Sequence, residues 1–285
     1  MILDGKKIAE IRTKELIEEF QFIAKTINRK PVLAIVQVGD LNASNLYIKH
    51  KINKANELGV QVDLYKFKED ITQNMLLKKL DEINEKADGI IVQLPLPEKI
   101  SSQLILNGIR LIKDVDGLCT KSTFNFYNEN NELTYTPATA AAIMDIIEYY
   151  KIDIKDKKVA VIGRSYLVGK PTAFLLKKLG GNVSTYNRKT GIKGVESADI
   201  LVSAAGQANL VKKENIKQGA VVIDAGTNWI IDEKTNKKIM VGDVNLEGDF
   251  DYVSSYTPVP GGVGPLTVVW LFKNLAKAIR TEYEF

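Results

Sequence analysis

Segments with helical periodicity alternate along the whole chain with short apolar segments of strand length. Helices are predicted at residues 5–26, 43–58, 72–86, 139–150, 168–179 and 265–281. Strands are predicted at residues 32–38, 60–67, 89–93, 158–163, 182–186, 199–204, 220–224 and 252–256. Helices placed between apolar strands are typical of βαβ units, whose strands run parallel. The alternation therefore predicts an α/β fold built on parallel sheets.

The alternation falls into two series, so the 285 residues are predicted to form two α/β domains with a cleft between them. The first domain comprises residues 1–138 plus 266–285, because the last helix is long enough to pack back on it. The second comprises residues 139–265 and has the strand–turn–helix order of a Rossmann-like nucleotide-binding domain. Polar residues 120–134 are expected to form a loop or a small hairpin.

Composition argues against several classes of function. The 39 basic and 35 acidic residues give a net charge of +4 and form no basic block, which argues against nucleic-acid binding. A single cysteine, Cys119, and a single histidine, His50, leave no internal disulfide and no expected metal site. We expect Cys119 to be buried and His50 to lie on the surface without a role. Neither a secretory signal nor a membrane-length apolar run is found, so a cytoplasmic protein with no membrane partner is expected.

Residues 158–171 read as a strand, a glycine turn and the start of a helix, which would aim backbone N–H groups at a phosphate. The turn has the spacing Gly163-x-Ser165-x-x-x-Gly169. An NAD site usually has an acid at the end of the next strand, but Tyr186 is followed by Asn-Arg-Lys. Arg188 and Arg164 therefore favour NADP over NAD, since guanidinium suits a 2′-phosphate. The alternative is a structural turn with two solvated arginines.

The first domain offers a different set of polar residues. Tyr47 and Lys51 are four residues apart on a predicted helix and so share a face. Gln93 follows a buried strand, at the strand end where parallel sheets bind ligands. Asp116 lies in the acidic turn of residues 113–117. A solvated lysine and a turn-forming aspartate are the alternative interpretations.

The segment Thr257-Pro-Val-Pro-Gly-Gly-Val-Gly-Pro-Leu-Thr267 contains three prolines and three glycines. Prolines restrict φ, while glycines allow close backbone approaches, so a stiff loop that can press on a flat ligand is expected. The alternative is a rigid connector into the last helix.

These segments, in this order, resemble the bifunctional methylenetetrahydrofolate dehydrogenase/methenyltetrahydrofolate cyclohydrolase family over essentially the whole length. The resemblance rests on Val38-Gly-Asp-Leu-Asn-Ala-Ser-Asn-Leu-Tyr-Ile-Lys-His-Lys51, Gly89-Ile-Ile-Val-Gln-Leu-Pro-Leu-Pro97, Lys113-Asp-Val-Asp-Gly117, Val161-Ile-Gly-Arg-Ser165 with Val168-Gly-Lys-Pro171, and Thr257–Thr267. It implies oxidation of 5,10-methylenetetrahydrofolate with NADP, followed by hydrolysis of the methenyl product to 10-formyltetrahydrofolate. It also implies a homodimer.

The resemblance implies specific site residues. Catalytic roles fall on Lys51, helped by Tyr47, Gln93 and Asp116. Folate contacts fall on Tyr47, Val92, Gln93, Leu94, Asp116, Pro260, Gly261, Gly262 and Gly264. Cofactor contacts fall on Gly163, Arg164, Ser165, Arg188 and Thr227, and no metal is implied.

Three segments depart from the family pattern: Pro137-Ala-Thr-Ala140, Tyr186-Asn-Arg188 and Leu118-Cys-Thr120. No catalytic position departs. Retention of Lys51, Gln93 and Asp116 argues against two alternatives, a dehydrogenase without cyclohydrolase activity and a non-catalytic nucleotide-binding regulator.

Overall fold

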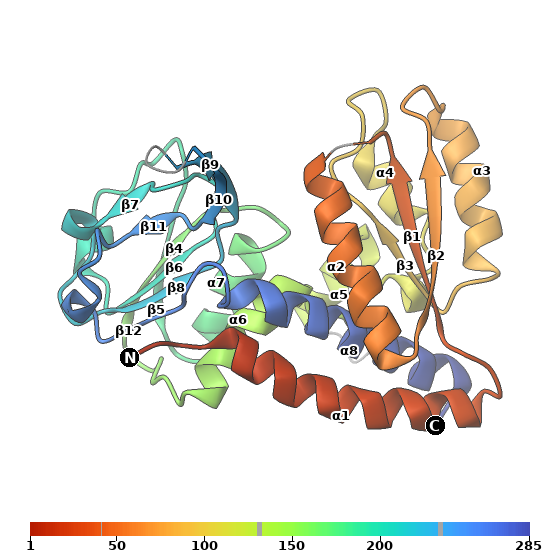
Figure 1. Ribbon diagram of the computed structural model, residues 1–285, viewed down its shortest axis with the longest axis horizontal. Helices are drawn as coiled ribbons and strands as arrows, with labels where there is room; N and C mark the ends of the chain where they lie inside the picture. The colour runs from red at the N-terminus through yellow and green to blue at the C-terminus, as the bar shows by residue number, and fades with distance from the viewer. Residues whose placement is uncertain (41, 130–132, 233–235) are drawn as a thin grey trace. The chain divides into compact units, whose positions relative to one another are not determined.

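The computed structural model describes residues 1–40, 42–129, 133–232 and 236–285. The chain divides into two compact units (Figure 1). Unit 1 comprises Met1–Glu10 and Thr139–Thr267, and unit 2 comprises Ile11–Ala138 and Val268–Phe285. Each unit contains a parallel sheet joined by helices, so the predicted parallel α/β fold is confirmed.

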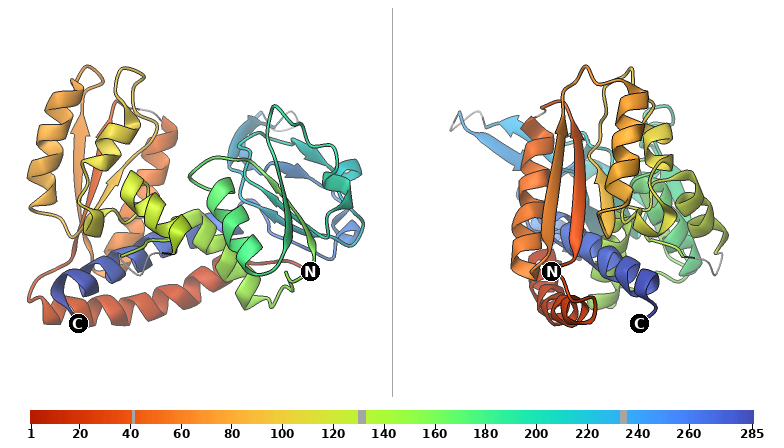
Figure 2. Two further views of the ribbon diagram at one scale, coloured as in Figure 1. Left: turned by 180° about the vertical axis from the view of Figure 1, so that it is seen from behind. Right: turned by 90° about the vertical axis from the view of Figure 1, so that its right-hand side faces the viewer.

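Unit 2 is built on a three-stranded parallel sheet in the order β2-β1-β3. Its strands are β1 (Val32–Val38), β2 (Gln61–Phe67) and β3 (Gly89–Val92). Helices α2 (Asn42–Leu58) and α3 (Gln73–Asn84) lie on opposite faces of this sheet (Figure 2). Right-handed crossovers from β1 to β2 and from β2 back to β3 require this arrangement. The strand order reverses between β1 and β3, which marks their carboxyl ends as the ligand-binding edge.

The remaining helices of unit 2 are α1 (Gly5–Thr26), α4 (Ser102–Asn107), η1 (Leu111–Lys113), α5 (Thr120–Asn128) and α8 (Val263–Tyr283). The first turns of α1 and α8 belong to unit 1. The Asn274 side chain of α8 donates hydrogen bonds to the carbonyls of Val115, at 2.8 Å, and Thr136, at 3.0 Å. Leu275 packs where a side chain on Gly89 would collide with it, so α8 lies close to β3.

Unit 1 is built on a five-stranded parallel sheet in the order β12-β8-β6-β4-β5. The strands are β4 (Lys158–Ile162), β5 (Asn182–Tyr186), β6 (Ile200–Ser203), β8 (Val221–Asp224) and β12 (Ser255–Tyr256). Helix α7 (Gly169–Lys178) joins β4 to β5, whereas β6 lies on the other side of β4. The strand order therefore reverses between β4 and β6, and their carboxyl ends form a second ligand-binding edge.

Smaller elements complete unit 1. They are α6 (Ala138–Tyr149), which begins at the unit boundary, the pair β7 (Val211–Lys212) and β11 (Val244–Asn245), the hairpin β9 (Asn228–Ile231) and β10 (Lys238–Val241), and the 3-10 helices η2 (Val195–Ser197), η3 (Lys213–Asn215) and η4 (Phe250–Tyr252). Buried apolar residues from β4, β6 and β8 pack with those of the loops into one core.

Some local predictions were wrong. Residues 120–128 form helix α5 instead of a loop or hairpin, and residues 130–132 lie outside the described residues. The Cys119 sulfur caps this helix by accepting the Ser122 N–H at 3.3 Å, a signal weaker than the usual serine or aspartate cap. The segment predicted as a stiff loop is helical from Val263, where α8 begins. Pro265 is tolerated there because the N–H groups of a first helical turn have no partner within the helix, so the N–H that proline lacks is not missed. The hairpin β9–β10 was not predicted, and β12 is shorter than the predicted strand.

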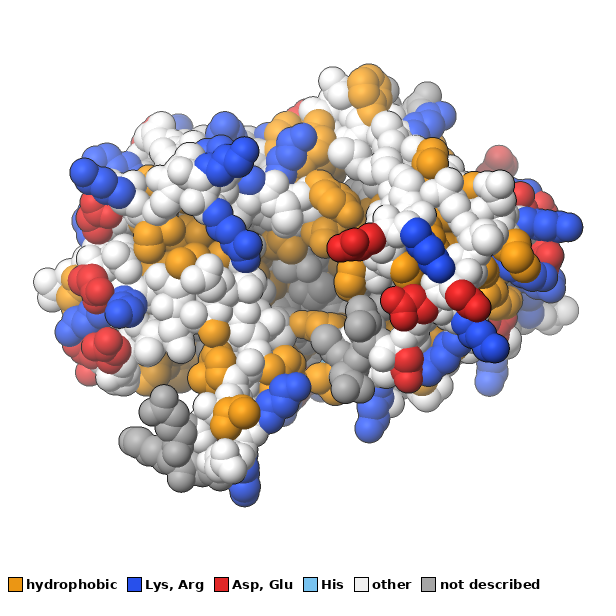
Figure 3. Space-filling view, turned by 90° about the horizontal axis from the view of Figure 1, so that it is seen from above, with side chains coloured by type: hydrophobic (Ala, Val, Ile, Leu, Met, Phe, Trp, Pro, Cys, Tyr) orange, Lys and Arg blue, Asp and Glu red, His pale blue; other side chains and the backbone are white. Residues whose placement is uncertain are grey.

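No helix in the described ranges is long and apolar enough to span a membrane. On the face shown in Figure 3, basic and acidic side chains are interspersed over both units. Cys119 is buried and His50 is exposed, as predicted.

Candidate functional site

The first cluster forms at the carboxyl end of β3 in unit 2. Strand β3 ends at Val92, and the Gln93 N–H continues the ladder by donating to the Val36 carbonyl of β1 at 2.8 Å. Lys51, on α2, donates from Nζ to Gln93 Oε1 at 3.0 Å. The other end of the same amide donates from Nε2 to the Leu94 carbonyl at 3.0 Å. Because Nε2 is occupied, Gln93 presents its oxygen to Lys51, and the two residues predicted to act together are in contact.

Asp116 lies near the Lys51 amine and interacts with it electrostatically. Burial lowers the pKa of Lys51, and the Asp116 carboxylate opposes this by raising it. Burial also raises the pKa of Asp116, while Lys51 lowers it. Both residues nevertheless keep partial solvent exposure, so the polar groups can be reached from outside.

The two aspartates of the turn differ in their contacts. Asp114 accepts hydrogen bonds from the N–H groups of Leu118, at 3.2 Å, and Cys119, at 2.9 Å. Within the described part of the chain, Asp116 accepts no hydrogen bond. Asp114 therefore holds the turn, and Asp116 is the carboxylate left available to a ligand.

The other predicted residues of unit 2 lie around this cluster. Tyr47, one helical turn before Lys51 on α2, is 42% exposed, so its ring is open to a flat ligand. Val92 is buried, and Leu94 is half-buried beside Gln93. The cluster combines an amine with a lowered pKa, an amide acceptor and an unbonded carboxylate. Such a set can transfer protons and recognise N–H donors.

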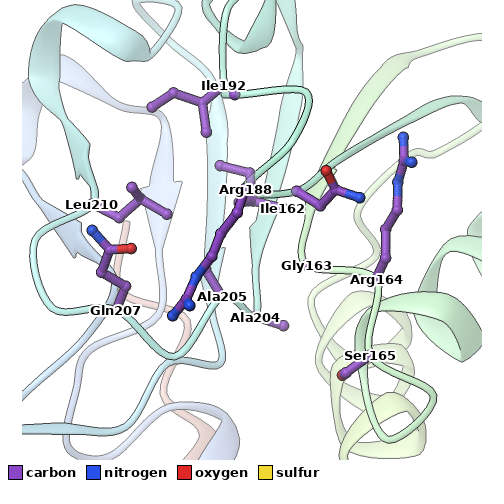
Figure 4. A pocket seen from close by; sticks show the side chains of 12 residues that line it. Ile162, Gly163, Arg164, Ser165, Arg188, Ile192, Ala204, Ala205, Gln207 and Leu210 are labelled. Atoms are coloured by element: carbon purple, nitrogen blue, oxygen red, sulfur yellow. The ribbon is translucent and has the colours of Figure 1, made fainter.

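A second site lies in unit 1 at the carboxyl ends of β4, β5 and β6. A cavity of about 400 Å³ opens there (Figure 4). It is lined by Ile162, Gly163, Arg164, Ser165, Asn187, Arg188, Gly191, Ile192, Ala204, Ala205, Gln207 and Leu210. Gly163 has φ +108°, and a side chain there would collide with the Ala204 carbonyl oxygen, so this position requires glycine. The Ser165 hydroxyl accepts the Val168 N–H at 3.2 Å just before α7.

The two arginines of the pocket differ in availability. Arg164 donates from Nε to the Thr185 hydroxyl at 2.9 Å and from Nη2 to the Thr185 carbonyl at 2.6 Å. Arg188 is exposed, and among the described residues it has no hydrogen-bond or ion-pair partner. In the view of Figure 4 its side chain extends toward the side of the pocket occupied by Gln207, while Arg164 points away from it. Of these two arginines, Arg188 is therefore the one with no partner in the described ranges, and its guanidinium can meet a phosphate.

The remaining predicted residues lie elsewhere in unit 1. Thr227, in the loop after β8, is half-buried and does not line this cavity. The segment containing Pro260, Gly261, Gly262 and Gly264 is fixed to the N-terminus of the chain. The Lys6 N–H donates to the Gly261 carbonyl at 2.9 Å, and a side chain on Gly5 would collide with the Gly262 carbonyl oxygen. This loop therefore has a structural role in unit 1, whatever else it contacts.

Sequence reasoning missed one wall of the cavity. Ala204, Ala205 and Gln207 follow β6, and Leu210 lies shortly beyond them. The available signal was topological, because β6 is the strand next to β4 across the point where the order reverses. Across the described ranges, no group of three or more His, Cys, Asp or Glu residues is placed to hold a metal ion.

Comparison with known proteins adds independent information. The model of the tetrahydrofolate dehydrogenase/cyclohydrolase catalytic domain matches residues 3–116, and the model of its NAD(P)-binding domain matches residues 137–283. The Bifunctional protein FolD of Mycoplasmopsis synoviae is 47% identical over 278 residues, which are 97% of this chain and 98% of that relative.

Two solved structures are similar over nearly their full lengths. The FolD methylenetetrahydrofolate dehydrogenase/cyclohydrolase of Campylobacter jejuni has a TM-score of 0.91 at 36% identity, with 99% of each chain covered. The Trypanosoma brucei enzyme, solved with NADP and an inhibitor, has a TM-score of 0.93 at 32% identity, with coverage of 100% of this chain and 99% of that one.

Proposed function

The chain belongs to the tetrahydrofolate dehydrogenase/cyclohydrolase family, and from this premise we propose which of its residues bind the substrate, bind the cofactor and carry out the reaction. The protein is a bifunctional one-carbon folate enzyme. It oxidises 5,10-methylenetetrahydrofolate to the methenyl form with NADP, and it hydrolyses that product to 10-formyltetrahydrofolate. We assign the folate chemistry to residues 1–138 plus 266–285 and the binding of NADP to residues 139–265.

The cavity of unit 1 fits a dinucleotide phosphate. Gly163 permits a close approach to the backbone, and the N-terminal end of α7 favours negative charge. Arg188 supplies a guanidinium that has no partner in the part of the chain that the structure describes. We assign Gly163 and Ser165 to the phosphates, Arg188 to the 2′-phosphate, and Thr227 to the border of the nicotinamide site. Arg164 supports the site through its bonds to Thr185. The chemistry that NADP supplies when bound is acceptance of a hydride from the one-carbon bridge.

The cluster of unit 2 carries the hydrolysis. The methenyl carbon is already electrophilic, so its attack by water needs a group that takes up a proton. The Lys51 amine can do so because burial lowers its pKa and Gln93 holds it in place. Asp116 is assigned to the N–H donors of the pterin, and Tyr47, Val92 and Leu94 to its ring. We further assign the loop containing Pro260, Gly261, Gly262 and Gly264 to the folate site.

The contact of Lys51 Nζ with Gln93 Oε1, beside the unbonded Asp116 carboxylate, is the observation that carries the cyclohydrolase assignment. A direct test is to mix the enzyme, NADP and methylenetetrahydrofolate and to follow NADPH and the methenyl compound by absorbance. We expect NADPH to appear while the methenyl compound is consumed faster than in buffer. If NADPH forms but the methenyl compound is consumed no faster than in buffer, the protein is a dehydrogenase without cyclohydrolase activity.

Replacing Arg188 with alanine is expected to remove most of the preference for NADP over NAD. One charge-assisted contact corresponds to about tenfold in affinity, so the Kd for NADP should rise about tenfold while that for NAD stays unchanged. Titration calorimetry with both cofactors measures this. Lys189→Ala, at an exposed neighbour that does not line the cavity, serves as the control. If Arg188→Ala weakens both cofactors equally, Arg188 does not read the 2′-phosphate.

We also propose that the enzyme is a homodimer located in the cytoplasm. Light scattering of the protein as it elutes from a size-exclusion column should then give twice the mass of one chain. A mass of one chain at micromolar concentration would refute the dimer.

A further inference from the structure

Asp243 lies in the turn between β10 and β11, and its side chain is completely buried. Its carboxylate is the acceptor of five hydrogen bonds. The donors to Oδ2 are the Ser203 hydroxyl at 3.0 Å, the Ala205 N–H at 2.7 Å and the Gly206 N–H at 3.2 Å, and the donors to Oδ1 are the Gln207 N–H at 2.9 Å and Asn228 Nδ2 at 2.9 Å. The Asp243 carboxylate is therefore hydrogen-bonded to the end of β6, to the loop of residues 205–207 and to the first strand of the hairpin β9–β10.

Three of the five donors are the consecutive backbone N–H groups of residues 205–207. Successive N–H groups that converge on one anion fix the path of the backbone, and Gly206 allows this path by adopting φ +64°. Within residues 204–207, Ala204, Ala205 and Gln207 line the wall of the cavity that follows β6 (Figure 4). The shape of that wall thus depends on a side chain almost 40 residues further along the chain.

The five donors to the Asp243 carboxylate are all uncharged groups. Among the described residues its hydrogen-bond partners include no lysine or arginine, and Asp224, an acid that interacts with it electrostatically, is also buried. Asp224 in turn accepts the N–H groups of Asp243, at 3.1 Å, and Val244, at 2.8 Å. A buried charge is costly unless it is fully hydrogen-bonded, so Asp243 depends on the loop amides as much as they depend on it.

We propose that Asp243 is a positioning residue for the cofactor, which shapes the wall of residues 204–207 before NADP binds. The proposal rests on the assignment of this cavity to NADP. A wall that is already ordered does not lose conformational freedom on binding, so the affinity is higher than for a mobile loop. In the isosteric variant Asp243→Asn, one acceptor oxygen becomes an NH₂ group that faces N–H donors. At least one loop amide then loses its partner and the wall moves.

Hydrogen exchange of the wild-type protein without cofactor tests the ordering directly. We expect the amides of Ala205, Gly206 and Gln207 to be protected, and adding NADP to change their protection little. Protection that appears only with NADP would overturn the inference. This measurement needs no variant, so it decides the question even where Asp243→Asn does not fold.

The variant Asp243→Asn tests whether the Asp243 carboxylate is responsible for the order of this wall. The matched control is Asp251→Asn, at an exposed aspartate of the same unit. At a temperature where both are folded, we expect Asp243→Asn to bind NADP at least about tenfold more weakly, the scale of a misplaced binding group. Asp251→Asn should bind it normally. Hydrolysis of the methenyl substrate without cofactor should be unchanged in both, because Lys51 and Gln93 lie in unit 2. Normal NADP affinity in folded Asp243→Asn would overturn the inference.

Failure of the cavity assignment gives a different pattern. If NADP binds elsewhere, neither Arg188→Ala nor Asp243→Asn changes its affinity. If only the role of Asp243 is wrong, Arg188→Ala weakens NADP and Asp243→Asn does not.

Discussion

Replacing Lys51 with methionine is expected to slow hydrolysis of the methenyl substrate by about 100-fold or more, the effect of losing a general acid or base. Methionine keeps an unbranched apolar side chain of nearly the same length but removes the amine that donates to Gln93 Oε1. The rate of methenyl disappearance measures the effect. NADP affinity should not change, because the cavity residues lie in unit 1.

Two further variants sharpen this test. Lys49→Met changes an exposed lysine on the same helix and should hydrolyse the substrate normally. Lys51→Arg keeps the positive charge but cannot release a proton near neutral pH, so its loss should approach that of methionine. If Lys51→Arg hydrolyses the substrate at the wild-type rate, charge alone suffices and proton transfer by Lys51 is wrong.

The alternation of helices and strands was enough to predict both sheets and hence both ligand-binding edges. Parallel strands bring their carboxyl ends together, so Gln93 after β3 was expected at one edge and Gly163 after β4 at the other. The helical spacing of Tyr47 and Lys51 predicted only that they share a face, whereas the pairing of Lys51 with Gln93 was implied by the family resemblance. The two parallel sheets were predicted correctly because local periodicity determines the helices and strands.

Contacts between distant side chains could not be predicted in this way. The sequence made both Arg188 and Arg164 candidates for binding the 2′-phosphate, yet Arg164 is hydrogen-bonded to Thr185 and Arg188 is not. Nothing local to Asp243 indicates that its carboxylate holds residues 205–207, since these contacts depend on the fold. Helix α5 was missed because most of its residues are polar and its cap is a cysteine.

The lowered pKa of Lys51 gives the pH dependence a definite sign. If the neutral amine is the base, hydrolysis rises with pH through this pKa, which lies below that of a free lysine. The Asp116 carboxylate raises the pKa of Lys51. The rising limb of the pH profile should therefore move to lower pH when that carboxylate is removed.

Asp116→Asn is expected to lower kcat/KM for the folate substrate about 10- to 100-fold in both activities. A charged hydrogen bond contributes about 1.5–3 kcal/mol, and the asparagine NH₂ would face the N–H donors of the pterin. NADP affinity should not change. The exposed Asp81, on α3 of the same unit, provides the control Asp81→Asn, which should leave both activities intact.

The stability of Asp116→Asn separates a binding role from a structural one. Burial raises the pKa of Asp116, so above the ordinary carboxyl pKa the folded chain binds more protons than the unfolded chain. The free energy of unfolding therefore falls as pH rises from the ordinary carboxyl pKa to the raised pKa of Asp116. Because Asp116 accepts no hydrogen bond within the described residues, Asp116→Asn should melt at the same or a higher temperature than wild type. Asp114→Asn, which breaks the bonds to Leu118 and Cys119, should melt lower. A lower melting temperature for Asp116→Asn, with folate and NADP weakened alike, would mark Asp116 as a turn residue.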